Sequence, residues 1–315
     1  MVVRLLLSRG FLFVVTLLAV SMLIFVMAEV LPGDIAVRVL GRESTEQARQ
    51  AFRERLNLDR PIHERYWLWL QGAVRGDFGA SLTNERAVSD IVGPRLRNTL
   101  IIGGAAFLLY IPVTLILASL AAVFRDRTID GSISVLTLVG LSMPEFVTGT
   151  ILLIVFAVAI PIFPVMSLVD RAETPGEYLR TLALPAITLM VIMSVYAIRM
   201  LRDNLIEVLD SEYVRMATLK GLSRRRVIFR HALPNAIVPA LNITALNLAY
   251  LLGGVVLVER VFSYPGLGSL LVDSILLRDV PVIEAIVLLI AAVYILGNLV
   301  ADVMTIVLNP RLRSG

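Results

Sequence analysis

The sequence predicts an all-α integral membrane protein with six transmembrane helices. Of its 315 residues, 57% are hydrophobic and 17% are charged, and the mean hydropathy is +0.83, whereas a soluble domain is about 45–50% apolar and about 25% charged. The apolar residues also lie in long runs nearly free of charge, and about 20 such residues cross the hydrocarbon of a bilayer. Helices are expected at 9–30, 98–124, 132–160, 181–201, 235–258 and 283–307.

The distribution of basic residues predicts which side of the membrane each loop faces. Six spans put both termini on one side, and if that side is the cytoplasm, most arginines of the short loops and tails lie inside. Basic loops are retained in the cytoplasm during insertion. We therefore expect a multi-pass protein of the plasma (inner) membrane with both termini cytoplasmic. The same retention of basic loops explains the net charge of +4, which therefore does not indicate a nucleic-acid partner.

The first apolar run has an alternative interpretation as a cleaved signal peptide. Arg4 and Arg9 precede it, and Val26-Met27-Ala28 forms a weak cleavage site. Its charge-free core, 11–28, is longer than the about 7–15 residues of a typical signal. This length favours an uncleaved transmembrane helix.

The composition excludes several kinds of catalytic and metal site. There is no cysteine, and the two histidines, His63 and His231, lie far apart in the sequence. Disulfides, thiolate ligands and cysteine nucleophiles are excluded, and no histidine metal site is expected. The Gly-x-x-x-x-Gly-Lys-Ser/Thr phosphate loop and the His-Glu-x-x-His motif are also missing from the sequence. The chain is therefore not expected to hydrolyse ATP by itself or to be an intramembrane enzyme.

Five helix-breaking sites interrupt the predicted spans. They are Pro112, Pro144, Pro185, Pro239 and Gly253-Gly254. Broken helices at membrane depth are tolerated where the freed backbone is buried in protein or lines a wet cavity. The pattern favours a moving, water-accessible structure. The alternative is that proline and glycine are simply more frequent in membrane helices.

The segment 31–97 is expected on the outer side. Apolar residues recur at helical spacing between Ala48 and Leu56. We expect a small helical platform rather than an independent domain. The whole chain, 1–315, is accordingly predicted to be one transmembrane domain.

The segment 202–234 is expected in the cytoplasm and is too long for a simple turn. A helix is predicted from Ser211 to Lys220, with Gly221 as its stop. Its apolar residues favour docking into a groove of a partner protein. The residues alone support equally well a helix that lies on anionic lipid, with its arginines at the headgroups.

This cytoplasmic loop resembles the signature of ABC importer permeases, which is Glu-Ala-Ala, three residues, Gly, nine residues and Ile-x-Leu-Pro. Four residues fall at the required spacings: Ala217, Gly221, Leu233 and Pro234. Arg215 and Met216 replace the leading Glu-Ala, and His231 replaces Ile. These departures are typical of the dipeptide/oligopeptide/nickel subgroup. The similarity extends over nearly the whole chain, for example through Leu31-Pro32-Gly33-Asp34 and Arg97-Asn98-Thr99-Leu100.

The resemblance implies a type I importer permease fold and a complex with several partners. These are a second related permease, two ABC ATPase subunits and an extracytoplasmic solute-binding protein, all assembled at the lipid bilayer. This chain would bind no cofactor, because ATP and Mg would be held by the ATPases. The resemblance also implies that the helix at 211–221 is a coupling helix seated in an ATPase groove. The expected coupling residues are Tyr213, Arg215, Met216, Ala217, Gly221, Leu233 and Pro234.

Four residues of the predicted spans are candidates for a translocation path: Glu145, Asn242, Asn247 and Tyr250. A carboxylate at the depth of Glu145 costs at least about 2.5 kcal/mol and normally faces a cavity or a partner. The family often has Ser at this position. We hypothesise that Glu145 favours a cationic group such as a peptide amine, the alternative being a structural pair with a neighbouring helix. For the other three residues the alternative is interhelical hydrogen bonding.

Three residues of a tight outer turn are expected near the extracytoplasmic mouth: Pro265, Gly266 and Gly268. Gly and Pro at such spacing are typical of turns. The alternative is that they serve only the turn itself.

The predicted function is that of a permease subunit of an ATP-driven importer. It would form half of the path for dipeptides, oligopeptides or a similar small solute delivered by a binding protein. The alternative is a stand-alone secondary transporter, which would need ion-coupling acids and internal repeats, yet the spans hold only three acids and no repeat is evident. A scaffold protein would not need the spacing from Ala217 to Pro234. Similar permeases carry nickel complexes, opines, glutathione or modified sugars, so the residues do not identify the cargo.

Overall fold

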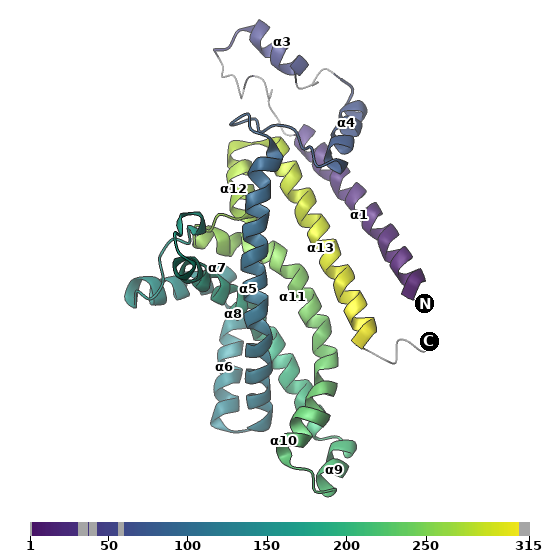
Figure 1. The fold of residues 1–315 in the computed structure, drawn as a ribbon, viewed down its shortest axis with the longest axis vertical. Coiled ribbons are helices and arrows are strands. Elements are labelled where there is room, and N and C mark those ends of the chain that lie inside the picture. Colours follow the sequence, from purple (N-terminus) through teal and green to yellow (C-terminus); the bar gives the residue numbers. More distant parts are fainter. Residues whose placement is uncertain (1, 31–36, 38–42, 56–59, 309–315) are drawn as a thin grey trace. The chain divides into compact units, whose positions relative to one another are not determined.

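The computed structural model describes residues 2–30, 37, 43–55 and 60–308. Within the helices, some side chains are not described: those of residues 2–8, 28–30, 52, 55, 238, 241–243, 245, 246, 248–254 and 300–308. The described residues are helical apart from turns, loops and one isolated antiparallel bridge between Ala80 and Ala87 (Figure 1). The chain forms two compact units, Met1–Arg97 with Gly266–Val293, and Asn98–Pro265 with Tyr294–Gly315.

The first unit contains the helices predicted between the first two spans. Its elements are α1 (Val2–Val30), α3 (Glu46–Arg55), α4 (Ile62–Val74), α12 (Leu267–Leu277) and the adjoining parts of α5 (Val88–Val123) and α13 (Val280–Leu308). Aromatic side chains dock α4 on α1. The ring of Phe25 lies 5.4 Å from that of Tyr66 and 6.0 Å from that of Trp69, centroid to centroid. Such pairs contribute about 0.5–1.5 kcal/mol beyond the burial of their area.

A buried carboxylate, that of Asp279, holds the loop between α4 and α5. It accepts hydrogen bonds from the backbone N–H of Leu82 at 3.0 Å and from the hydroxyls of Ser81 and Thr83 at 2.5 and 2.8 Å. Asp279 lies in the turn between α12 and α13, directly after Arg278, whose φ is +55°. Hydrogen bonds to a charged group are stronger than neutral ones. Asp279 therefore ties two loops that are far apart in the sequence.

The second unit is built around α8 (Pro175–Leu209), the most buried of the four described helices that are long and apolar enough to cross a membrane. Its other elements are α6 (Thr128–Ser142), α7 (Glu145–Leu153), α9 (Glu212–Leu219), α10 (Arg224–Arg226) and α11 (Leu233–Val261), with π-helical turns at Ile154–Ala159 and Val227–Ala232. Pro175 occupies the first turn of α8, where its missing N–H is no loss, and the Thr174 hydroxyl accepts from the N–H of Glu177 at 3.2 Å. The most apolar window of α8 is 61% buried, against 28% for α5, and α8 packs against both α6 and α11.

Each predicted span falls on one or more of the observed helices. Four of the described helices, α1, α5, α8 and α13, are long and apolar enough to cross a membrane, and the pair α6–α7 would be a fifth. The 29-residue α11 covers the span predicted at 235–258, although most of its central side chains lie outside the described part. The all-helical architecture is confirmed, and the total of six spans stays a prediction. The helix predicted from 98 begins earlier, at Val88.

The helix predicted at 132–160 is not one continuous helix. It breaks between Ser142 and Glu145, and the two parts are bent by 114°. Pro144 causes the break, because a proline disfavours the helical conformation of the preceding residue. Met143 is extended accordingly, with ψ at 133°. Pro112 and Pro185, by contrast, lie inside continuous helices.

Candidate functional site

A cavity of about 250 Å³ lies at the break between α6 and α7. Its lining comes from α6, α7, α8 and α11 and consists of Gly140, Leu141, Met143, Glu145, Thr148, Val191, Ile192, Met193, Val195 and Asn247. The structure thus brings two predicted path residues, Glu145 and Asn247, into one cavity. The side chains of the other two, Asn242 and Tyr250, lie outside the described part of the chain.

The helix break positions Glu145. Pro144 precedes α7, and Glu145 is the first residue of that helix. The N-terminus of a helix carries a partial positive charge, which stabilises a carboxylate at this place. Glu145 is half-buried, and no described residue forms an ion pair or hydrogen bond with its carboxylate. The carboxylate is therefore available to a solute in the cavity.

Asn247 fixes the wall formed by α8 and α11. Its Nδ2 donates to the backbone carbonyl of Met193 at 3.1 Å, so the interhelical hydrogen bond that was the alternative to a path role is present. The side-chain oxygen of Asn247 remains as an acceptor beside the cavity. On the opposite wall, a Cβ at Gly140 would meet Val195 Cγ1 at 3.0 Å. A side chain at this position would require Val195 to shift, so the glycine favours the close approach of α6 to α8.

The helix predicted in the segment 202–234 is present as α9. One face is buried: Val214 and Ala217 are 3% and 9% exposed and join a core cluster with Leu205 of α8. The opposite face is apolar but exposed, with Tyr213, Met216 and Leu219 at 45%, 52% and 73%. Arg215 is also exposed, beside Glu212. The sequence left open which apolar residues would point inward, and the tertiary packing decides this.

Gly221 ends α9 as predicted. Its φ is +79°, a left-handed conformation that favours glycine. The N–H of Gly221 bonds to the carbonyl of Thr218, and the N–H of Leu222 bonds to that of Ala217, which is a Schellman arrangement. This stop sharply reverses the chain after α9.

Leu233 and Pro234 begin α11 directly after the π-helical turn Val227–Ala232. Pro234 has no N–H to donate to the carbonyl four residues earlier, so the regular α-helical pattern is interrupted there. The hydroxyl of Tyr213 and Nδ2 of Asn235 both donate to the carbonyl of His231, at 3.4 and 2.7 Å. Tyr213 thus connects α9 to the π-helical turn that precedes α11.

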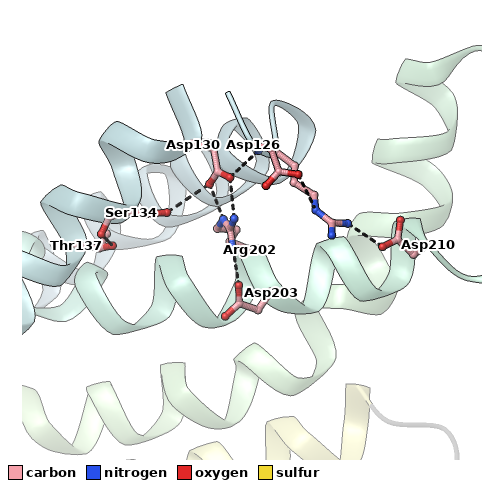
Figure 2. A network of polar contacts seen from close by, with 8 residues as sticks. Asp126, Asp130, Ser134, Thr137, Arg202, Asp203 and Asp210 are labelled. Carbon is pink, nitrogen blue, oxygen red and sulfur yellow. Dashed lines mark hydrogen bonds and ion pairs between the residues drawn. The ribbon is translucent and has the colours of Figure 1, made fainter. Parts of the chain in front are cut away.

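A charged network, which the sequence analysis missed, joins the turn between α5 and α6 to the end of α8. The guanidinium of Arg202 donates two hydrogen bonds to the carboxylate of Asp130, of 2.6 and 2.7 Å, and one to Asp203 at 2.7 Å (Figure 2). The backbone N–H of Asp126 donates to Asp130 at 3.0 Å. A second link, from Arg125 to Asp210, measures 2.9 Å. Two features of the sequence could have indicated this network: Asp130 stands just before the predicted span 132–160, and Arg202 just after the predicted span 181–201.

The outer-turn residues Pro265, Gly266 and Gly268 are all buried. The carbonyl of Pro265 accepts from Nδ2 of Asn98 at 2.9 Å, and the hydroxyl of Tyr264 donates to the carbonyl of Asn98 at 2.8 Å. Burial raises the pKa of Tyr264, which keeps its hydroxyl protonated as a donor. These residues build the turn and the start of α12. Their place near a mouth stays a prediction.

Comparison with known proteins places this helical architecture in a family. Residues 114–314 match the description "Binding-protein-dependent transport system inner membrane component", and residues 2–103 match the N-terminal region of such components. The chain is 36% identical over 298 residues, which is 95% of each protein, to the "Glutathione transport system permease protein GsiC" of Escherichia coli (strain K12). The proteins of the same name from Shigella dysenteriae and Salmonella paratyphi A are equally similar.

The chain belongs to the inner-membrane permeases of binding-protein-dependent ABC importers. The resemblance found in the sequence to the dipeptide/oligopeptide/nickel group is thereby confirmed. The permease has several apolar helices and is a membrane component of a transport system. Its helix α9 lies where the signature of these permeases was identified in the sequence.

Proposed function

We propose that this permease forms half of the translocation path of an ATP-driven importer. The other half is a second related permease, and the complex includes two ABC ATPase subunits and an extracytoplasmic solute-binding protein. The permease crosses the membrane six times with both termini in the cytoplasm. ATP and Mg are held by the ATPases, and this chain binds no cofactor.

The observation that carries the proposal is the two-sided packing of α9. Val214 and Ala217 anchor the helix to the second unit, while Tyr213, Met216 and Leu219 present an exposed apolar face. A short helix with such a face suits a hydrophobic groove in a partner. Because α9 follows α8 after a two-residue turn, a displacement of α9 is transmitted through α8 to the cavity at the break between α6 and α7.

Substitution of the exposed face tests the coupling role. With Met216→Ser and Leu219→Ser together, we expect at least about tenfold weaker association with the ATPases, because burying each apolar side chain contributes about 1.5–3 kcal/mol. The measurement is the amount of ATPase that co-purifies with the tagged permease, together with ATPase activity stimulated by the loaded binding protein. Glu207→Gln, at an exposed acid of α8 outside α9, is the matched control. Undiminished association of the doubly substituted permease would contradict the role of α9.

For the cargo, we propose a dipeptide, an oligopeptide or a similar small solute with a protonated amine. The relatives named for glutathione transport favour a peptide of this size, and glutathione carries such an amine. Glu145 supplies the complementary charge in the cavity with Asn247. A charge-assisted hydrogen bond contributes about 1.5–3 kcal/mol.

Replacement of the carboxylate tests this assignment. Glu145→Gln should lower uptake of a peptide with a free amine about tenfold and leave an N-acetylated analogue nearly unaffected. The assay is uptake of labelled peptides by cells that express the complete importer. Glu173→Gln, at an exposed acid outside the cavity, is the control. If Glu145→Gln leaves the uptake of every substrate unchanged, Glu145 does not line the path.

Purification from native membranes in mild detergent separates this proposal from a stand-alone secondary transporter. We expect a second permease and P-loop ATPases to accompany the tagged chain, and a co-purified binding protein would lead to the cargo. A chain that runs alone, and transports in proteoliposomes with only an ion gradient, would overturn the proposal.

A further inference from the structure

A second cavity, of about 530 Å³, lies in the second unit on the inward side of α9. It is separate from the cavity of Glu145, and the two share no lining residue. Its walls come from the end of α5, the end of α8, α9 and the segment around α10. The volume is within the range of about 300–1,000 Å³ that is usual for small-molecule sites.

The charged residues that line the cavity are mostly basic. Arg125, Arg127 and Arg224 line it, against one acid, Asp210. Arg125 pairs with Asp210 at 2.9 Å, so the acid is already neutralised. Among the described residues, no carboxylate lies within ion-pair distance of Arg127 or Arg224. Two arginines are therefore left with uncompensated charge at one place.

The two arginines are nevertheless held in position. The Arg127 guanidinium lies 5.9 Å from the centre of the Phe124 ring, and Nη2 of Arg224 donates to the carbonyl of Val123, the last residue of α5, at 3.1 Å. A guanidinium has five donors, and this single hydrogen bond leaves most of those of Arg224 unused. Planar, preoriented guanidinium groups match the geometry of phosphate and carboxylate groups, so the site suits an anion rather than a neutral ligand of the same size.

The cavity also has an apolar lining. It includes Ile206 and Leu209 of α8 and Ala122 and Val123 of α5, the two long helices that end at this cavity. An anionic head beside an apolar wall is the chemistry of a phospholipid at the membrane surface. A soluble phosphate ester would leave the apolar lining without a partner.

We propose that this cavity binds the phosphate headgroup of an anionic phospholipid from the cytoplasmic leaflet, behind α9. The assignment to that leaflet rests on the proposed orientation, whereas the binding itself does not. The bound lipid braces α9 from the side that Val214 and Thr218 share with the cavity. The outward face with Met216 and Leu219 stays free for its partner.

Lipid binding to the purified, delipidated full-length permease tests the proposal, without ATPases or transport. Phosphatidylglycerol is titrated in neutral detergent and the retained lipids are counted by native mass spectrometry. Phosphatidylcholine and glycerol 3-phosphate serve as the net-neutral and soluble probes. We expect one preferentially retained phosphatidylglycerol per chain.

Arg127→Gln with Arg224→Gln should weaken this binding about 30-fold, because each arginine near an anionic lipid surface contributes about fivefold. Arg225→Gln with Arg226→Gln removes the same charge from exposed positions outside the cavity and should leave the binding unchanged. An equal loss in both doubly substituted chains, or no loss in either, would overturn the proposal. Complete displacement of the lipid by glycerol 3-phosphate would also overturn the proposal, because it would identify a soluble phosphate as the occupant.

A reporter on α9 keeps the test valid if the arginine variants fail to fold. The chain has no cysteine, so Thr218→Cys introduces one thiol at the cavity wall. Phosphatidylglycerol should slow maleimide labelling of this thiol, and phosphatidylcholine should not. Equal labelling rates in both lipids would also overturn the proposal.

Discussion

The ion pair between Arg202 and Asp130 makes a quantitative prediction about the second unit. Asp130→Asn keeps the shape of the side chain but removes its charge and turns one acceptor into a donor facing the guanidinium. Arg202→Met removes the other partner. Figure 2 shows that these two residues connect the first turn of α6 with the C-terminal part of α8.

The size of the effect follows from burial and geometry. The side chains of Asp130 and Arg202 are 6% and 22% exposed, and removing one partner of a buried pair costs about 3–5 kcal/mol. In Asp130→Asn, Arg202 is still paired with Asp203 and partly exposed to solvent. We therefore expect a loss of unfolding free energy at the lower limit of this range, about 3 kcal/mol. The double variant, Asp130→Asn with Arg202→Met, buries no unpaired charge. Its loss of unfolding free energy should therefore be smaller than the sum of the two single losses, by a coupling free energy of at least about 1.5 kcal/mol.

A single introduced cysteine provides the assay. Ser194 of α8 is buried, and Ser194→Cys is nearly isosteric in a chain without other cysteines. The rate of thiol labelling in mixed micelles measures the free energy of opening the second unit. A loss of about 3 kcal/mol should accelerate labelling about 100-fold. Unchanged rates in both single variants, or strictly additive losses in the double variant, would refute the reasoning.

Two further substitutions test other tertiary contacts. Asp279→Asn removes the charged acceptor of three hydrogen bonds, and we expect faster tryptic cleavage at the exposed Arg86 in the loop that Asp279 holds; an unchanged cleavage rate would show that the loop is fixed by other contacts. Gly140→Ala places a Cβ 3.0 Å from Val195 Cγ1 and should lower the free energy of unfolding by about 1–3 kcal/mol. Val195→Ala in the same chain should restore most of that loss in the labelling assay, and failure to do so would locate the strain elsewhere.

Much of the local structure could be predicted from the sequence. Charge-free runs located the long helices because a membrane-crossing helix needs about 20 apolar residues in succession. The helix from Ser211 and its stop at Gly221 followed from local propensity and from the need for glycine at a left-handed φ. These features depend on residues close together in the chain.

The prolines illustrate where such reasoning stops. Pro112 and Pro185 remain inside continuous helices, whereas Pro144 separates two helices by 114°. Neighbouring helices can satisfy the backbone groups that a proline frees, so the outcome depends on what packs around each site.

The sequence by itself determined the membrane-helix character of the chain, its family signature and the identity of Glu145 and Asn247 as unusual polar residues in apolar runs. Only the tertiary structure decided that these two line one cavity, that Val214 and Ala217 rather than Met216 and Leu219 face inward, and that Arg202 pairs with Asp130, 72 residues earlier. The physical reason is that hydropathy and helix propensity act along the chain. Cavities, buried faces and ion pairs depend instead on which distant helices pack together.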